Sequence, residues 1–192
     1  MHPGYGYHFH PHKEVEILTF ILEGELTYTV KGQGGGCMRR GDFTYLTAGS
    51  GIEHSEFNWG DVPMRMIQVW MKPQHKNLHP HVQYATFNEN CHLNQWYLMA
   101  SDAKNNPIQL QQNVQIWVLK QEGNKKTEFL VAKNQQAYLV QLEGSSTING
   151  ECLSRYDGLE VYGEKIQIMT EREACFLLVV TPLSIGTELN EK

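Results

Sequence analysis

Two short pairs of metal-binding residue types are the part of this sequence most suited to chemistry. His10 and His12 flank Pro11, and His54 and Glu56 flank Ser55, so each pair places two ligands two positions apart. In a β-strand, residues i and i+2 point to the same face, and each pair can therefore direct two ligand atoms at one point. If both strands line one barrel, three imidazoles and one carboxylate converge on a site for a divalent transition metal.

The segments between and beside the two pairs are typical of β-strands. Residues 15–22 are rich in β-branched and aromatic side chains, and Glu23-Gly24 follows as a turn into the alternating segment 25–31. This pair of segments is interpreted as a hairpin. Residues 32–36 are glycine-rich but precede no helical pattern, so they are interpreted as a flexible loop and not as a phosphate-binding loop.

Further strands are expected over residues 42–46 and 64–71. In the second of these, Met66 and Trp70 are expected to point inward, as core residues or as the lining of an apolar pocket beside the metal. From residue 72 to about 95 the composition changes to prolines, histidines and asparagines, which is typical of a linker. The motif His79-Pro80-His81 in this stretch repeats the first pair, but it is interpreted as an exposed loop and not as a second metal site.

The second half of the chain repeats the layout of the first. Strands are expected over residues 114–120, 127–133, 136–142, 145–148, 158–162, 165–169 and 174–181. The order of a strand, Glu-Gly and an alternating strand occurs at Glu23-Gly24 and again at Glu143-Gly144, which indicates an internal duplication. No histidine follows His92, so the second copy is expected to hold no site of the same kind.

The composition sets broad limits on the function. The chain has 192 residues and a formal net charge of −5, without a basic segment, which argues against a general nucleic-acid surface. It contains neither an apolar run long enough to span a membrane nor the pattern of a signal peptide, so a cytoplasmic protein with no membrane partner is expected. The cysteines Cys37, Cys91, Cys152 and Cys175 form no C-x-x-C pair and are interpreted as reduced, and as packing residues or bystanders and not as nucleophiles.

The motifs together resemble those of a known family. Gly4, His10-Pro11-His12, Glu16 and Glu23-Gly24 are similar to the first cupin motif, while Gly41-Asp42, residues 48–52 and His54-Ser55-Glu56 are similar to the second. Residues 10–24 and 47–56 resemble the pirins closely, and the likeness extends over nearly all of the chain. The resemblance implies an all-β fold of two tandem cupin barrels, that is, double-stranded β-helices or jelly rolls. The expected divisions are an N-terminal metal-binding barrel at 1–82, a linker at 83–94 and a degenerate C-terminal barrel at 95–192.

The resemblance also implies ligands and an activity. Its metal ligands are His10, His12, His54 and Glu56; by spacing alone, Glu16 stays open as an alternative to Glu56. Fe²⁺ is the first choice of metal, and Ni²⁺, Cu²⁺, Mn²⁺ and Zn²⁺ suit the same ligands. The implied activity is a quercetin 2,3-dioxygenase that acts on a flavonol, or a similar enediol-like molecule, and dioxygen. Glu56 would accept the substrate's hydroxyl proton, and Phe9, Phe20, Phe57 and Trp70 are the candidates for flanking a planar substrate.

Two other functions are compatible with the same resemblance. One is a metal- or redox-dependent transcription co-regulator or protein-binding module without enzymatic activity, and the other is an inactive structural bicupin. The chain also departs from the family, because pirin-like proteins usually carry several dozen residues before the His-Pro-His motif. The N-terminal strands of the family are thus expected to be missing, as in a truncated form, or to be replaced by other segments or a partner chain.

Overall fold

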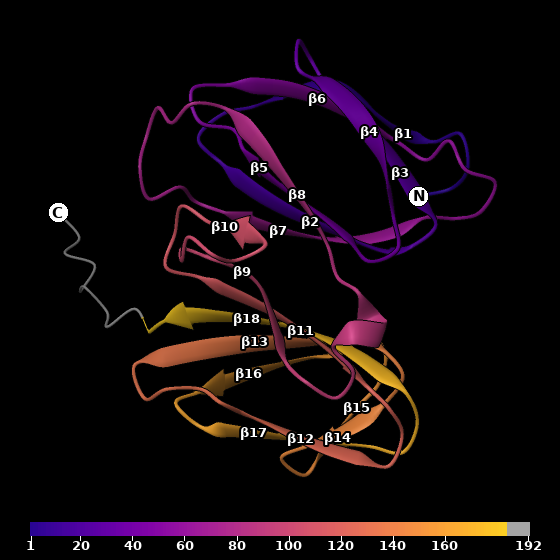
Figure 1. Cartoon of the computed structure of the whole chain (residues 1–192), viewed down its shortest axis with the longest axis vertical. Helices are drawn as coiled ribbons and strands as arrows, with labels where there is room; N and C mark the ends of the chain where they lie inside the picture. Colours follow the sequence, from indigo (N-terminus) through magenta and orange to yellow (C-terminus); the bar gives the residue numbers. More distant parts are fainter. Residues whose placement is uncertain (184–192) are drawn as a thin grey trace, which may run out of the picture. The chain divides into compact units, whose positions relative to one another are not determined.

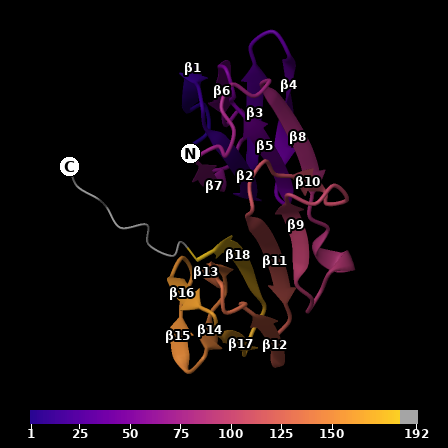
Figure 2. The same ribbon diagram turned by 90° about the vertical axis from the view of Figure 1, so that its left-hand side faces the viewer.

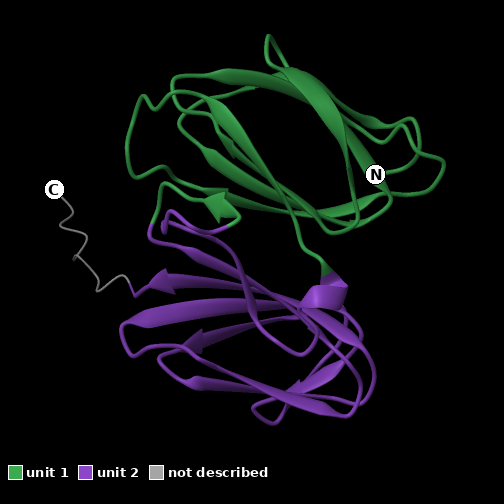
Figure 3. Cartoon of the chain, viewed as in Figure 1, with its two compact units in different colours: residues 1–88, 107–112 green, residues 89–106, 113–192 purple. Residues whose placement is uncertain are grey.

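The computed structural model describes residues 1–183, and in this part of the chain every regular element is a β-strand except one short 3-10 helix (Figure 1). The chain divides into two compact units. The first holds residues 1–88 and 107–112, and the second holds residues 89–106 and, of the described chain, 113–183 (Figure 3). Within the described residues, no helix has the length and apolar character needed to cross a membrane.

The first unit consists of two four-stranded antiparallel sheets. One has the order β1-β6-β3-β4 and the other the order β7-β2-β5-β8, and Figure 2 shows β1 beside β6. The strands are β1 Gly6–His12, β2 Glu16–Glu23, β3 Glu25–Val30, β4 Gly34–Arg39, β5 Asp42–Thr47, β6 Ile52–Phe57, β7 Arg65–Met71 and β8 His81–Thr86. The short strand β10 Ile108–Gln109 also belongs to this unit, where the backbone of Gln109 exchanges two hydrogen bonds with the Gln83 side chain.

The second unit repeats this arrangement. Its sheet β12-β17-β14-β15 has the same order as β1-β6-β3-β4, and β13 lies between β16 and β18 as β2 lies between β5 and β7; β11 and β9 extend that sheet beyond β18. The predicted duplication is therefore present. The elements are η1 Glu89–Cys91, β9 Tyr97–Ser101, β11 Gln115–Gln121, β12 Lys125–Leu130, β13 Gln135–Glu143, β14 Ser146–Ile148, β15 Glu151–Leu153, β16 Gly158–Tyr162, β17 Lys165–Thr170 and β18 Ala174–Pro182.

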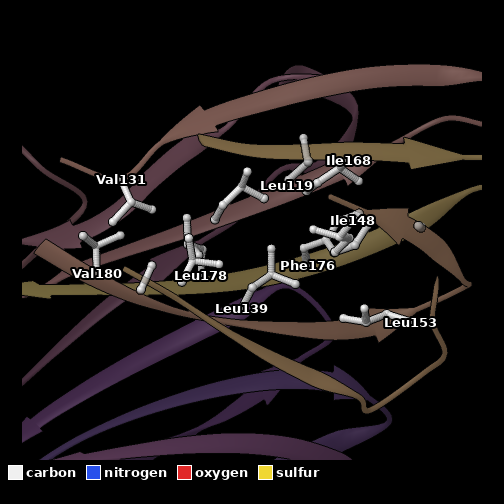
Figure 4. Close-up of a cluster of buried hydrophobic side chains, with 13 residues drawn as sticks. Leu119, Val131, Leu139, Ile148, Leu153, Ile168, Phe176, Leu178 and Val180 are labelled. Carbon is white, nitrogen blue, oxygen red and sulfur yellow. The ribbon is translucent and has the colours of Figure 1, made fainter. Parts of the chain in front are cut away.

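Each unit has its own apolar core. In the second unit, Leu139, Ile148, Phe176 and Leu178 are fully buried between the sheets (Figure 4). In the first unit, one cluster forms around Ile17 and a second around Ile21. Burial of such side chains stabilises a fold by about 1.5–3 kcal/mol each. The four cysteines are free; Cys175 is buried in the second unit, whereas Cys37, Cys91 and Cys152 are exposed.

The predicted hairpin at Glu23-Gly24 is wrong, because the two strands lie in different sheets. Strand β2 pairs with β5 and β7, whereas β3 pairs with β4 and β6. Gly24 makes the corner with a φ of 69°, and a Cβ there would lie 2.9 Å from the Cα of Met64. Gly144 has a φ of 72° at the equivalent corner. The Glu-Gly repeat therefore marks a change of sheet.

Two segments expected to be irregular are strands. Gly34 to Gly36 begin β4, and a Cβ at Gly35 would lie 2.2 Å from the carbonyl oxygen of Tyr28, so glycine is needed for the close approach to β3. Residues 81–86 form β8 along the edge of β5, although they fall in the linker-like stretch. The predicted linker therefore begins inside a strand of the first unit. The composition concealed β8 because an edge strand is half exposed and carries polar residues.

Candidate metal centre

The pairing of β1 with β6 brings the two sequence motifs together. His10 lies opposite His54, with His12 two residues further along β1. The ring centroids are 4.5 Å apart for His10 and His54, 4.9 Å for His12 and His54, and 4.8 Å for His10 and His12. The three side chains, here called the histidine triad, thus face one point, as the spacing of the motifs predicts.

The nitrogen atoms of the triad have the spacing of metal ligands. One ligand nitrogen from each ring lies within 4.8 Å of the other two. Nε2 of His10 and Nε2 of His54 are 3.0 Å apart, which is about the separation of two imidazole nitrogens that bind one ion at a right angle with bonds of about 2.1 Å. Nε2 of His12 is buried without a hydrogen-bond partner. A buried acceptor in this position fits a metal ligand, because it is otherwise unsatisfied.

Hydrogen bonding and burial also prepare the triad for a cation. Nδ1 of His10 lies 2.7 Å from the carbonyl oxygen of His8; since a carbonyl can only accept, Nδ1 carries the proton and Nε2 keeps its lone pair. Burial lowers the pKa of His54 to about 4, with His10 and His12 adding to the effect. Burial, and then His10, lowers the pKa of His12 as well. Neutral imidazoles are the form that binds metals.

Glu56 lies beside the triad, but its carboxylate is outside the closest group. Within residues 1–183, the group of mutually close ligand atoms contains the three histidines and not Glu56. The Glu56 side chain is buried, and Oε1 accepts a hydrogen bond of 3.1 Å from Nε2 of Gln68. Burial raises the pKa of this carboxyl, while His10 and the bond from Gln68 act to lower it. Its role as fourth ligand stays a prediction.

The alternative ligand Glu16 lies on another face. The chain turns between β1 and β2, where Glu14 has a φ of 52°, so the regular alternation from residue 10 to 16 is interrupted. Ile17 and Thr19 of β2 line the interior of the unit beside His54, whereas Oε2 of Glu16 accepts a hydrogen bond of 2.7 Å from Nε2 of Gln112. Neighbouring residues of a strand point to opposite faces, and Glu16 therefore points away from the triad.

Gln68 is a residue of the site that the motifs did not identify. It lies on β7 between Met66 and Trp70, and its side chain reaches both Glu56 and Thr19. The only signal in the sequence was one polar residue in an inward-facing series of a strand. Met66 packs against the apolar cluster around Ile21.

The four aromatic candidates have different positions. Trp70 was expected to point inward, but its side chain is 57% exposed. The centroid of its ring lies 5.1 Å from that of the His12 ring. Phe20 is a core residue stacked on Phe43. Phe9 is exposed, and Phe57 is half-buried and stacks on Trp59. Tyr7 of β1 was not among the candidates from the sequence, but the centroid of its ring lies 6.1 Å from that of the His10 ring.

The cavity that reaches His54 and Glu56 from inside the barrel is too small for an aromatic ligand. A cavity of about 20 Å³ lies behind His54 and Glu56 and is lined by apolar residues such as Leu26 and Val30. This volume accepts about one water molecule. The triad is open to solvent on the other side, where His10 and His12 are partly exposed. The rival motif around His79 lies outside the triad, and Nδ1 of His81 is 3.2 Å from the carbonyl oxygen of His79.

The second unit has other residues at the positions of the ligands. Strand β17 pairs with β12 and β14 as β6 pairs with β1 and β3. Since Ile168 lies opposite Thr127 and Ile148, it corresponds to His54, which lies opposite His10 and Val30. By the same register, Phe129 corresponds to His12 and Thr170 to Glu56. Isoleucine and phenylalanine offer no metal ligand, so the described part of this unit has no equivalent of the triad.

A chain of two β-barrels with a histidine triad in the first is a bicupin, and comparisons place it in a family. The pirin family model matches residues 2–71, and a model described as the quercetinase C-terminal cupin domain matches residues 97–180. The chain belongs to the pirin family. The predicted recognition and the predicted fold, two cupin barrels, are both confirmed.

Several relatives resemble the whole chain. The quercetin 2,3-dioxygenase of Escherichia coli (strain K12) is 27% identical over 93% of this chain and 78% of its own length. A pirin-like protein of Caulobacter vibrioides is 29% identical over 93% of this chain and 78% of its own length. A solved structure, the bacterial pirin YhhW from Escherichia coli in complex with nickel(II), is also similar. Its sequence is 26% identical to this chain, the TM-score is 0.86, and the match covers 95% of this chain and 79% of that one.

Proposed function

We propose that the chain is a metal-dependent dioxygenase of the quercetin 2,3-dioxygenase type, which cleaves a flavonol or a similar enediol-like molecule. The observation that carries the proposal is the convergence of three imidazoles at a partly exposed position, with an unpartnered Nε2 on His12. Relatives that carry the name of this enzyme, at 27% identity, support it.

The roles of the residues follow from their positions. His10, His12 and His54 hold the metal through nitrogen atoms, and Glu56 is the fourth ligand. Fe²⁺ is the proposed metal, and the nickel complex of YhhW supports Ni²⁺ as an alternative. A bound divalent ion supplies positive charge that favours an anionic oxygen of the substrate. The carboxylate of Glu56 accepts the proton of the substrate's hydroxyl. Trp70 flanks the planar rings at the exposed side of the triad.

Oxygen uptake with quercetin tests the activity. Protein reconstituted anaerobically with Fe²⁺, and in parallel with Ni²⁺, should consume dioxygen once quercetin is added, whereas the chelator-treated protein should not. Glu56→Gln should retain part of the metal and lose about 10²–10⁴-fold in turnover, as expected for the loss of a general base. No uptake by the metal-replete protein would rule out the flavonol dioxygenase, and full turnover by Glu56→Gln would rule out the proton transfer.

A metal-dependent protein-binding module, such as a transcription co-regulator, is the second candidate. The observation that favours it is the exposure of large aromatic side chains on β1, where Tyr7 is 59% and Phe9 is 51% exposed. If the metal-replete protein consumes no oxygen but its binding to a protein partner or to DNA changes with metal, this function replaces the enzymatic one. An inactive structural bicupin would show neither behaviour.

A further inference from the structure

A chain of three side chains connects Glu56 to the exposed side of the triad. The indole Nε1 of Trp70 donates to Oε1 of Gln68 over 3.2 Å. Nε2 of Gln68 donates to Oε1 of Glu56 over 3.1 Å and to Oγ1 of Thr19 over 3.2 Å. Each member except Trp70 is buried or half-buried, and Trp70 is 57% exposed.

The chemistry of the groups gives this chain one direction. An indole N–H can only donate, so the oxygen of the Gln68 amide must face Trp70. The amide nitrogen then faces the interior, where its two hydrogens match the two acceptors on Glu56 and Thr19. A reversed amide would place two acceptors, Gln68 Oε1 and Glu56 Oε1, against each other in a buried site, which costs free energy. Trp70 therefore fixes the orientation of the Gln68 amide.

We propose that Gln68 is a positioning residue for the Glu56 carboxylate, and that Trp70 fixes the Gln68 amide in the orientation that this task requires. The inference rests on the proposed function, because it assumes that Glu56 acts at the metal site. Residues that orient ligands typically change metal affinity by about 10–100-fold when they are removed. The ring of Trp70 also contacts His12, so one exposed residue touches the triad on one side and orients the carboxylate through Gln68 on the other.

The affinity of the metal-free protein for Ni²⁺, measured by calorimetry, tests the proposal. Gln68→Leu removes the donor and should weaken binding about 10-fold. Trp70→Phe keeps an aromatic ring but removes the indole N–H, and should weaken binding by a smaller factor, about 2–5-fold, because the amide is still present. Trp59→Phe is the matched control, since Trp59 is equally exposed at 59% and stacks on Phe57 instead; its affinity should not change.

A double-mutant cycle shows whether Gln68 acts through Glu56. In the Glu56→Gln background, Gln68→Leu should cause no further loss of Ni²⁺ affinity beyond about twofold. A 10-fold loss that persists in this background would overturn the proposal, and so would wild-type affinity in Gln68→Leu. If the wild-type protein binds none of the tested metals, the proposed function itself fails, which is a different result from intact binding that is insensitive to Gln68.

A measurement without metal separates positioning from misfolding. In the metal-free protein, the side-chain amide resonances of Gln68 should shift in both Glu56→Ala and Trp70→Phe, and should stay in place in Trp59→Phe. Backbone amide resonances of residues that do not contact the substituted side chain should be unchanged in each of the three variants, which reports an intact fold. Gln68 amide resonances that do not respond to Glu56→Ala would contradict the contact on which the proposal depends.

Discussion

At the scale of single residues, the triad is distinguished by the burial and the hydrogen bonding of its imidazole rings. His10 Nδ1 is held by a backbone carbonyl, His54 is almost fully buried, and His12 Nε2 has no partner. The unpartnered, buried Nε2 of His12 is costly without a cation. The spacing of the motifs predicted these three residues because strand alternation is a local rule. It did not predict Gln68, whose role depends on the placement of β7 against β6.

Removal of one imidazole should abolish specific metal binding. His10→Ala is preferable to a change at His54 because His10 is only half-buried, so the fold should be kept. We expect the bound metal to fall from about one ion per chain to a small fraction, measured by elemental analysis after dialysis. His79→Ala, in the exposed motif, is the control and should keep the full metal content. Equal loss in both variants would show that binding is not at the triad.

The metal-free protein should lose stability in mild acid through His54. Its folded pKa of about 4 lies below the ordinary value of 6.5, so between these pH values the unfolded chain binds more protons than the folded one. The stabilisation is fully present above pH 6.5 and falls by on the order of 1–3 kcal/mol as the pH drops toward 4. Urea unfolding of chelator-treated protein at pH 7 and pH 5 measures it. In His54→Gln the free energy of unfolding should depend less on pH. If its pH dependence is the same as in the wild-type protein, a group other than His54 causes the loss of stability.

At the scale of elements, the Glu-Gly corners decide how each barrel is built. The sequence predicted most strands correctly, including 64–71, 136–142 and 158–162, because their side chains alternate or are β-branched. The prediction was wrong at the Glu-Gly corner. A Glu-Gly turn that leads into a strand paired with the preceding one has the same sequence pattern as a turn that leads into the opposite sheet. The sequence analysis also missed β4. Glycines in a strand can allow a close approach of two backbones, but in the sequence they look the same as the glycines of a loop.

A comparison of two glycines tests the corner. Gly24 and Gly32 have similar positive φ values, 69° and 78°, but a Cβ at Gly24 would lie 2.9 Å from Met64 whereas none of the described atoms lies within 4 Å of one at Gly32. Gly32→Ala should cost about 1 kcal/mol of unfolding free energy from backbone strain alone. Gly24→Ala should cost about 1–3 kcal/mol more from the added overlap. Denaturant unfolding measures both, and equal costs would contradict the close packing at the corner.

At the scale of the whole molecule, one metal site serves a chain with two cores. Each unit buries its own apolar cluster, and only the first has the triad among the described residues. The sequence predicted this asymmetry from the absence of histidines after His92. It could not predict that residues 107–112 belong to the first unit, because long-range association leaves no periodic pattern in six residues.

Metal should therefore stabilise one unit selectively. In calorimetric unfolding with Ni²⁺ at about 100 times its dissociation constant, the unit that holds the triad should gain about 2.7 kcal/mol, and the other should gain nothing. We expect one of two transitions to move to higher temperature. His10→Ala is the control, in which neither transition should move. A uniform shift of both transitions would contradict independent stabilisation of the first unit.

The separation of the first unit into residues 1–88 and 107–112 determines when it can be completed during synthesis. One sheet needs β6 and the other needs β8 before it is complete, and non-local pairing such as that of β1 with β6 folds slowly. Gln112, which bonds the buried Glu16, leaves the ribosome after residues 89–106 of the second unit. A gene cut after residue 88 would therefore release a barrel in which the buried carboxylate of Glu16 lacks the hydrogen bond from Gln112.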